Sequence, residues 1–250
     1  MKIEKIVKNK NNYTILFDNG DKIKTYDEVI INNNLLFHKE VNDDILKKIM
    51  NDTTYYDSYY KIIKFVNRKL RSEFEINNYI DKLQITNKDK IIKELKNKKI
   101  INDNLFIKAF IQDKINLTND GPIKIKKELL EHNIDEEIIN NELEVFLDEL
   151  KIEKINKVIN KMINSNKNKS VYLLKQKIMT NLINMGYLKE DVLFELNKYN
   201  LNDDAAIKKE YDLLYKKLSK KYNNEELMFQ IKNKLYQKGY STDSINNIIE

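Results

Sequence analysis

The apolar positions of this chain follow two different periods, and the change between them lies near residue 40. Tyr13, Ile15 and Phe17 occupy alternate positions, as do Ile23 and Thr25, and Asn19-Gly20 stands between the two stretches. A period of two is typical of half-buried strands, and Asn-Gly favours a type I′ hairpin turn in which both residues have positive φ. The apolar stretch 29–31 predicts a third strand. We therefore expect a small β-hairpin region over 1–42.

From residue 43 onward the apolar residues recur at helical spacing, and the pattern itself repeats along the chain. Asn133, Gly186 and Gly239 each follow an apolar helical stripe, and successive members of this series are 53 residues apart. Asn and Gly are the residues that best tolerate the left-handed conformation just after a helix end. Each of the three is therefore predicted to terminate a helix.

Other polar residues predict where helices begin. Shorter helices are expected to start near Asp135, Lys189 and Ser241. The apolar residues expected to face the core from these helices are Ile138, Val192 and Ile245. Asn and Asp side chains cap free backbone amides. The pairs predicted on this basis to begin first helices are Asn51-Asp52, Asn102-Asp103 and Asn202-Asp203.

Together these boundaries predict an all-α fold class, built from tandem three-helix repeats with a small β-hairpin region at the N-terminus. Repeats of this kind bury their cores mainly against their neighbours, so an elongated, curved array is expected. The predicted domains are the β-hairpin region 1–42 and four helical repeats at 43–101, 102–149, 151–199 and 202–250.

Composition supports helices and restricts the class of partner. Charged residues make up 34% of the chain, whereas it contains only 4 Gly and 1 Pro. The net charge of +6 arises from 45 basic and 39 acidic residues that are interleaved, which favours a solvated helical surface over a dedicated polyanion clamp. Weak, direct binding of single-stranded DNA is compatible with this balance.

The absence of cysteine fits a reducing cytoplasm. No apolar run approaches the roughly 18 residues that a membrane span needs, so we expect a cytoplasmic chain without membrane contact.

Enzymatic chemistry has little support in the sequence. There are only 2 histidines, no cysteine and no glycine-rich phosphate loop. His38 lies at the edge of the strand region and His132 at a predicted helix end, and both are interpreted as structural. The carboxylates form no fixed metal-binding pattern. We expect no catalytic residue, no bound metal and no cofactor, and a hydrolytic enzyme is the least favoured alternative.

The segment 68–76 combines two arginines with a helix-capping motif. Ser72 and Glu75 form an S-x-x-E capping box, which predicts the start of a helix. Arg68 and Arg71 are three residues apart and are predicted to share one face of the preceding helix. Their guanidinium groups are candidates for binding an anionic or acidic partner. The alternative is that both are ordinary solvated charges, with Arg71 close to the last carbonyls of that helix.

A second helix start is marked by Gly121-Pro122, because Pro is favoured at the first helical position. Leu129 belongs to the apolar stripe of this helix. Lys126 and Lys127 in the same helix are further candidates for partner binding, and the alternative is a solvated helix face.

These residues resemble the RecX family in their order and spacing, most densely between residues 60 and 135. The resemblance implies that some of them act mainly in the structure: Ser72, Glu75, Asn102, Asp103, Phe106, Gly121 and Leu129. It also implies a contact with a RecA filament or with DNA, for which the candidates are Arg68, Arg71, Lys126 and Lys127.

The function implied by this resemblance is regulatory. A member of the family is expected to bind the RecA recombinase filament on single-stranded DNA as a monomer and to inhibit ATP hydrolysis and strand exchange. It would thereby modulate recombination, DNA repair and the SOS response. The alternative left open is a sequence-independent nucleic-acid-binding helical repeat protein that acts through charge alone.

Overall fold

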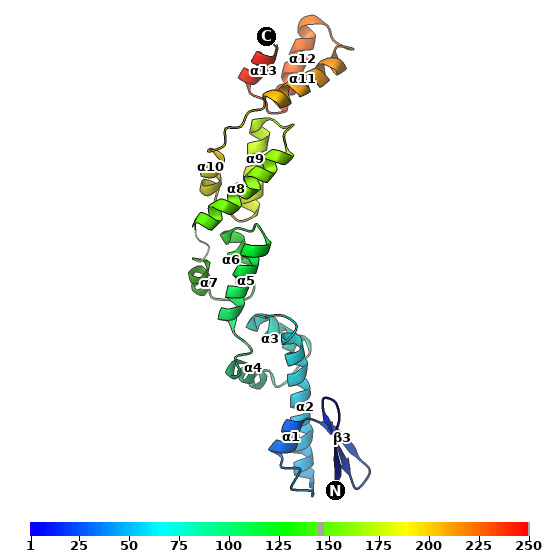
Figure 1. The fold of residues 1–250 in the computed structure, drawn as a ribbon. Coiled ribbons are helices and arrows are strands. Elements are labelled where there is room, and N and C mark those ends of the chain that lie inside the picture. Colours follow the sequence, from blue (N-terminus) through cyan, green and yellow to red (C-terminus); the bar gives the residue numbers. More distant parts are fainter. Residues whose placement is uncertain (145–147, 250) are drawn as a thin grey trace. The chain divides into compact units, whose positions relative to one another are not determined.

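The computed structural model describes residues 1–144 and 148–249, and Figure 1 shows its ribbon. Contacts within the chain divide it into two compact units, Met1–Phe106 and Ile107–Glu250. The described residues contain three strands, all of them before residue 26, and thirteen helices. The all-α fold class, with consecutive groups of three helices and a small N-terminal sheet, is confirmed.

The N-terminal sheet is antiparallel, with the strand order β1-β2-β3. Its strands are β1 Ile3–Lys8, β2 Tyr13–Phe17 and β3 Lys22–Thr25. Ile15 and Phe17 of β2 are buried, as the alternation predicts, and they pack in one core with α1 and the start of α2. The hairpin formed by β2 and β3 is therefore confirmed.

The turn of this hairpin is not of the predicted type I′. Only Gly20 adopts a positive φ, of 87°, whereas Asn19 does not. The Gly20 amide donates to the Phe17 carbonyl at 2.9 Å, and the Phe17 amide donates to the Asp21 carbonyl at 3.0 Å. This pattern is a three-residue loop that closes with a glycine bulge. The Asn19 side chain accepts from the Asp21 amide at 3.1 Å and so favours the bulged turn.

The predicted third strand at 29–31 is also wrong. These residues lie in the helix α1 Asp27–Asn32, where Val29 and Ile30 are buried and Ile31 is 64% exposed. The third strand is instead β1, which pairs with β2. The misassigned segment 29–31 is short, and a run of three apolar residues suits one turn of a buried helix as well as a strand.

The long helix α2 Asp43–Val66 contributes to two cores. Its first half, with Ile49, packs against the sheet, and its second half packs against α3 Glu73–Lys82 and α4 Lys88–Asn97. The prediction that Asn51-Asp52 begins a helix is wrong, because both residues lie inside α2. The N-cap is Asn42, whose side chain accepts from the Ile45 amide at 2.9 Å.

Three further groups of helices follow. The first contains α5 Asp103–Leu117, α6 Pro122–Leu130 and α7 Glu136–Leu143. The second contains α8 Asp148–Ser165, α9 Val171–Asn184 and α10 Lys189–Leu196. The third contains α11 Asp204–Leu218, α12 Asn224–Gln237 and α13 Thr242–Ile249.

The boundary between the two compact units falls within α5. The predicted repeat boundaries at 42, 101, 149–151 and 199–202 stay predictions. Of these, the boundary near 149 adjoins residues 145–147, which lie outside the described residues.

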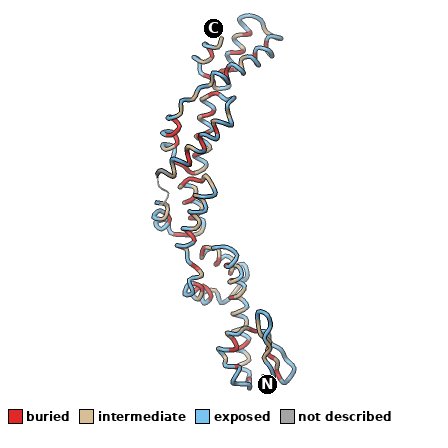
Figure 2. Tube along the Cα trace, viewed as in Figure 1, coloured by how far each residue is buried: buried red, intermediate tan, exposed pale blue. Residues whose placement is uncertain are grey.

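Buried residues recur along each group of helices, as Figure 2 shows in red. Separate apolar clusters join α8 to α9 and α10, and α11 to α12 and α13. In the short helices Val192 and Ile245 are buried as predicted, but Ile138 is 41% exposed and its neighbour Ile139 is fully buried. The prediction for Ile138 is wrong because consecutive helical residues point about 100° apart, so one position changes the face.

The predicted helix ends at Gly186 and Gly239 are confirmed, with φ angles of 89° and 79°. At the first, the Gly186 amide donates to the Ile183 carbonyl and the Tyr187 amide to the Leu182 carbonyl, which is a Schellman motif. Leu182 and Tyr187, which flank this motif, are both buried. Asn133 adopts a positive φ of 55° and lies three residues beyond the last residue of α6.

Within Ile107–Glu250, the second helix of each group begins beside the C-terminus of the second helix of the following group. The Gly121 amide, at the start of α6, donates to the Met185 carbonyl at the end of α9 at 2.6 Å. The Ile123 amide donates to the Gly186 carbonyl at 3.1 Å. At the next junction the Ser170 hydroxyl, at the start of α9, donates to the Lys238 carbonyl at 2.8 Å. The repeats are therefore connected through their helix termini as well as through apolar packing.

This geometry predicts different costs for alanine at two glycines of the same unit. Gly186→Ala should lower the free energy of unfolding by about 1–2 kcal/mol for the left-handed backbone. It should lose about 1–3 kcal/mol more because the new Cβ would overlap the Lys124 amide of α6. Gly239→Ala should lose mainly the first contribution, because its neighbours are side chains of Ser170, Leu173 and Tyr172 that can move. Urea denaturation followed by circular dichroism measures both, and equal losses would contradict the close approach at Gly186.

Candidate partner-binding surface

The loop between α2 and α3 carries the two arginines. α2 ends at Val66, so Arg68 and Arg71 lie beyond its last turn, and the prediction that they share a face of this helix is wrong. The reason is local, because Asn67 is the C-cap of α2 and the next helix is capped only five residues later. The two arginines consequently have different surroundings.

The capping box at the start of α3 is confirmed. The Glu75 amide donates to the Ser72 hydroxyl, and the Ser72 amide donates to the Glu75 carboxylate, both at 3.2 Å. The Asp103 carboxylate, at the start of α5, accepts from the Glu73 amide at 2.8 Å. Three backbone amides at this helix start are thus bonded to side chains, which places Ser72, Glu75 and Asp103 in the structure of the α3 terminus.

Arg71 is held between α2 and α3. Its guanidinium lies 3.8 Å from the centre of the Phe65 ring and 3.2 Å from the Glu75 carboxylate. The Phe65 ring in turn stacks on Tyr79, with centroids 3.8 Å apart. Burial would raise the pKa of Glu75, but hydrogen bonds from Lys69 and the Ser72 amide, together with the nearby charges, lower it. Arg71, only 16% exposed at its side chain, therefore has a clear packing role.

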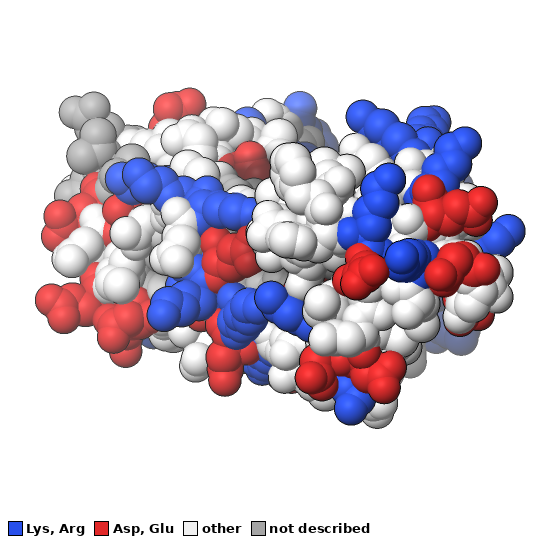
Figure 3. All heavy atoms as spheres, turned by 90° about the horizontal axis from the view of Figure 1, so that it is seen from below, with Lys and Arg blue, Asp and Glu red and all other residues white. Residues whose placement is uncertain are grey.

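Arg68 is exposed and lines an open groove of about 780 Å³. The other basic residues of this groove are Lys8, Lys10 and Lys64. On the face of the molecule in Figure 3, Lys and Arg side chains are interspersed with Asp and Glu. The groove is thus a local concentration of positive charge, whereas the face drawn in Figure 3 carries charges of both signs.

The Asn102-Asp103 pair connects two helices. The Asn102 side chain accepts from the Leu105 amide at 3.1 Å and so caps α5, as predicted. Asp103 caps α3, the second helix of the preceding group. Asp203 has the same relation to α9, because its carboxylate accepts from the Val171 amide at 2.9 Å. Phe106 is buried, 6% exposed. These motif residues therefore lie where one group of helices meets the next.

Gly121 lies at a close approach between α6 and the end of α9. A Cβ atom at Gly121 would come within 2.5 Å of the Gly186 carbonyl oxygen. Glycine is thus the residue that allows the Gly121 amide to reach the Met185 carbonyl. Leu129 of α6 is fully buried.

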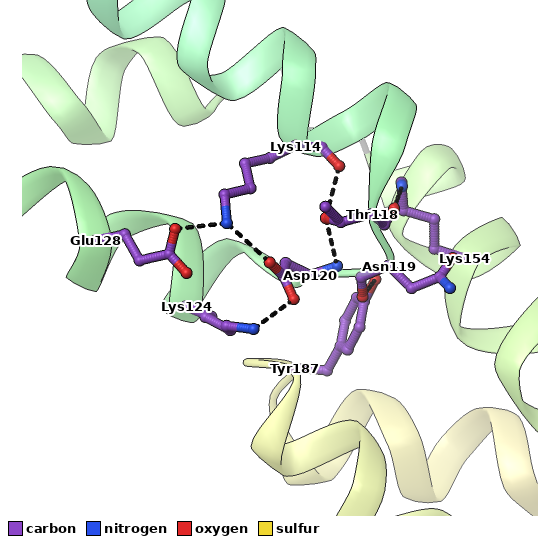
Figure 4. Close-up of polar contacts among 8 residues, drawn as sticks. All are labelled: Lys114, Thr118, Asn119, Asp120, Lys124, Glu128, Lys154 and Tyr187. Atoms are coloured by element: carbon purple, nitrogen blue, oxygen red, sulfur yellow. Dashed lines mark hydrogen bonds and ion pairs between the residues drawn. The ribbon is translucent and has the colours of Figure 1, made fainter.

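A polar cluster surrounds this junction and is shown in Figure 4. Asp120, 8% exposed, accepts from Lys124 at 2.7 Å and from Lys114 at 3.1 Å. Lys114 also pairs with Glu128 at 2.5 Å. Burial would raise the pKa of Asp120, but the hydrogen bonds from Lys124 and Lys114 outweigh it and lower the pKa. The carboxylate is therefore charged and bonded at neutral pH.

Lys154 and Tyr187 complete the cluster from α8 and the end of α9. The Lys154 ammonium donates to the carbonyls of Ile115 and Thr118, both at 2.6 Å, so it caps the C-terminus of α5. Burial lowers its pKa. The Tyr187 hydroxyl donates to the Asn119 carbonyl at 3.1 Å. Asp120, Lys154 and Tyr187 were not predicted from the sequence to form a cluster. The pattern offered only one signal, the position of Asp120 directly before Gly121-Pro122.

The two candidate lysines of α6 differ as the arginines do. Lys126 pairs with Glu136 of α7 at 2.6 Å. Lys127 is exposed and lines a hollow of about 650 Å³ with Glu131 and His132. Arg68 and Arg71 thus belong to the unit Met1–Phe106, whereas Lys126 and Lys127 belong to Ile107–Glu250.

Within 1–144 and 148–249, no group of three or more His, Asp or Glu side chains is arranged to hold a metal ion. None of the helices in these two ranges is both long enough and apolar enough to cross a bilayer.

Comparisons with known proteins agree with this architecture. A family model described as "RecX, second three-helix domain" matches residues 102–143. The chain is 32% identical to "Regulatory protein RecX" of Streptococcus agalactiae serotype III, over 100% of this chain and 98% of that protein. It is 28% identical to the protein of the same name from Oceanobacillus iheyensis, over 97% and 94% of the two chains.

Two crystal structures share the fold. That of a regulatory protein RecX matches with a TM-score of 0.65 at 22% identity, over 76% of this chain and 96% of that chain. That of RecX from Lactobacillus salivarius matches with a TM-score of 0.54 at 22% identity, over 58% and 96%. These similarities support the fold of the repeats.

The contacts of the two arginines predict effects on stability of different size. Arg71→Ala should lower the free energy of unfolding by about 1–2 kcal/mol, because it removes the contact with Phe65 and the pair with Glu75. Arg68→Ala should change it by less than about 0.5 kcal/mol, because the side chain is exposed. Thermal and urea denaturation of the two variants measure this, and a stability loss confined to Arg68→Ala would refute the assignment.

The lowered pKa of Asp120 predicts a pH-dependent contribution to stability. Because the folded-state pKa lies below the unfolded value, this contribution is present above the unfolded pKa of about 4 and is lost as pH falls through the folded pKa. Asp120→Asn should be about 1.5–3 kcal/mol less stable than wild type at neutral pH. The difference should shrink on acidification. Urea titrations at neutral and acidic pH test this, and a difference independent of pH would exclude the carboxylate charge as its cause.

Proposed function

Because this chain belongs to the RecX family, we propose that it regulates the RecA recombinase by binding its filament on single-stranded DNA. Binding inhibits ATP hydrolysis and strand exchange and so modulates recombination and DNA repair. The observation that carries this proposal is the 32% identity to a protein named Regulatory protein RecX, over the full length of this chain. The protein acts as a monomer in the cytoplasm and has no catalytic turnover of its own.

The repeated architecture supports contact with a large, periodic target. Consecutive groups of three helices repeat along the chain, and each group has apolar residues of its own that are buried. When several such groups engage one filament, each further contact becomes intramolecular, so moderate individual contacts combine into a higher overall affinity. A filament of many identical recombinase subunits presents a matching series of sites.

The candidate contact residues divide by their surroundings. Arg68 and Lys127 are exposed and are available to acidic protein groups or to phosphate. Arg71 and Lys126 already pair with Glu75 and Glu136, so their contribution to binding includes the position of the elements that carry them. We propose Arg68 and Lys127 as direct contacts and Arg71 and Lys126 as positioning residues.

The proposed function predicts a specific biochemical effect. Wild-type protein should suppress the single-stranded-DNA-dependent ATP hydrolysis of its cognate RecA in a concentration-dependent and saturable way. A coupled ATPase assay measures this, with the protein alone and RecA without DNA as controls.

If wild-type protein at concentrations that saturate the filament leaves the ATPase rate unchanged, the proposed function is wrong. Binding to bare and RecA-coated single strands, compared in low and high salt, then separates filament contact from simple attraction to phosphate. The latter should fall steeply with added salt.

A further inference from the structure

One open groove of the unit Met1–Phe106 is strongly basic. It lies between the β1–β2 turn and the C-terminal end of α2, and its volume is about 780 Å³. Its charged lining consists of Lys8, Lys10, Lys64 and Arg68, with Asp27 as the one carboxylate among the lining residues. The local balance is thus far more positive than that of the whole chain, in which basic and acidic residues are nearly equal.

The four cations of the groove are not neutralised by the protein. None has a carboxylate within ion-pair distance in the part of the chain that the structure describes. Elsewhere in the same unit, Lys69, Lys96 and Lys98 each pair with a glutamate at 3.1 Å or less. The groove cations are therefore free to meet the charges of an external anion.

The two walls of the groove are held in place by their own hydrogen bonds. In the turn, the Asn9 amide donates to the Asn12 carbonyl at 2.8 Å, and the Asn9 side chain donates to Asn12 and Thr14 at 2.9 Å and 3.0 Å. The other wall consists of the last two turns of α2 and of Asn67 and Arg68, which follow it. A ligand would consequently meet a preformed surface, which reduces the entropy lost on binding.

Aromatic rings lie beside the cations. Tyr13, Tyr26 and Tyr60 line the groove, and the rings of Tyr26 and Tyr60 are 4.7 Å apart. The hydroxyls of Tyr26 and Tyr60 already donate to Asp57 and Glu28, which leaves the rings as apolar surface. Burial and the bond to Asp57 raise the pKa of Tyr26 to about 12, so this ring is uncharged at neutral pH.

We propose that this groove is a binding site for single-stranded DNA. The cations bind successive phosphates, and the tyrosine rings contact the bases, which is the combination found in sequence-independent single-strand sites. An acidic protein segment would use the cations but not the rings, so a nucleic acid fits the lining better. The assignment deepens the proposed regulatory function, on which its biological role rests, by giving the chain its own contact with the strand that carries the filament.

The test compares two double charge reversals in the full-length chain. Lys10→Glu with Arg68→Glu changes one exposed residue on each wall of the groove. Lys47→Glu with Lys48→Glu changes the net charge equally at exposed positions of the same helix, about 24 Å from Lys64 along α2. Circular dichroism and thermal unfolding verify that both variants are folded. Lys10→Gln with Arg68→Gln serves as a milder second variant.

The readout is fluorescence anisotropy of a labelled oligothymidylate at several salt concentrations. The groove variants should lose about tenfold or more in affinity at low salt. Removal of two phosphate contacts should reduce the slope of log affinity against log salt by about 1.4. The control variant should keep the wild-type slope. Equal losses in groove and control variants, or a groove variant with wild-type affinity and slope, overturn the site.

RecA-dependent ATP hydrolysis, measured on the same variants, separates this site from the proposed function. If wild type inhibits ATP hydrolysis and the groove variant binds DNA as wild type does, the proposed DNA site is wrong and the proposed function stands. Loss of DNA binding by the groove variant, with no inhibition by wild type, keeps the site and removes the function. If the groove variant binds the oligonucleotide normally but loses binding to DNA-free recombinase, the groove takes an acidic protein surface, and the proposal is wrong.

Discussion

The pairing of helix termini is the constraint on which the structure of Ile107–Glu250 depends. An α-helix leaves four amides at its start and four carbonyls at its end without internal partners, and burial of such groups unbonded is costly. Here the start of α6 donates to the end of α9, and the start of α9 is bonded to the end of α12. Consecutive groups of helices thus satisfy each other's backbone, and their relative position within this unit follows from it.

Several unusual residues follow from this pairing. Glycine at 121 and 186 lets two backbones approach more closely than a Cβ atom would allow. Lys154 is buried with its ammonium on two carbonyls at the end of α5, so its charge meets the negative end of a helix. Asp120 sits between two lysines beside the same junction. The contacts between consecutive groups of helices are therefore polar and hydrogen-bonded, whereas the interior of each group is apolar.

The residues that carry the family resemblance lie mostly at helix termini and in the core, and not on the exposed surface. Ser72, Glu75, Asp103 and Gly121 bond or admit backbone groups at helix starts, and Leu129 is buried. These motif residues therefore determine how the helices are capped and packed. The exposed charged residues Arg68 and Lys127 are available to a partner, but many other lysines along the chain are exposed as well.

The sequence by itself determined the helical class, the strands β2 and β3, the capping box at Ser72 and the helix ends at Gly186 and Gly239. These features depend on local physics: side-chain period, capping chemistry and the conformational freedom of glycine act over a few residues. It did not determine the turn type at Asn19, the helix at 27–32, the start of α2 or the inward face of α7, where short apolar runs and caps allow more than one outcome.

Only the tertiary structure decided which charges are free and which are committed. Arg68 and Arg71 look alike in the sequence, yet one is exposed and the other lies against Phe65 and Glu75. Asp103 and Asp203 read as caps of their own helices, but each binds an amide of another helix about 30 residues away. Lys154 is indistinguishable in the sequence from the many surface lysines, yet it is buried. Their partners come from distant parts of the chain, and no local pattern encodes which distant group a side chain will meet.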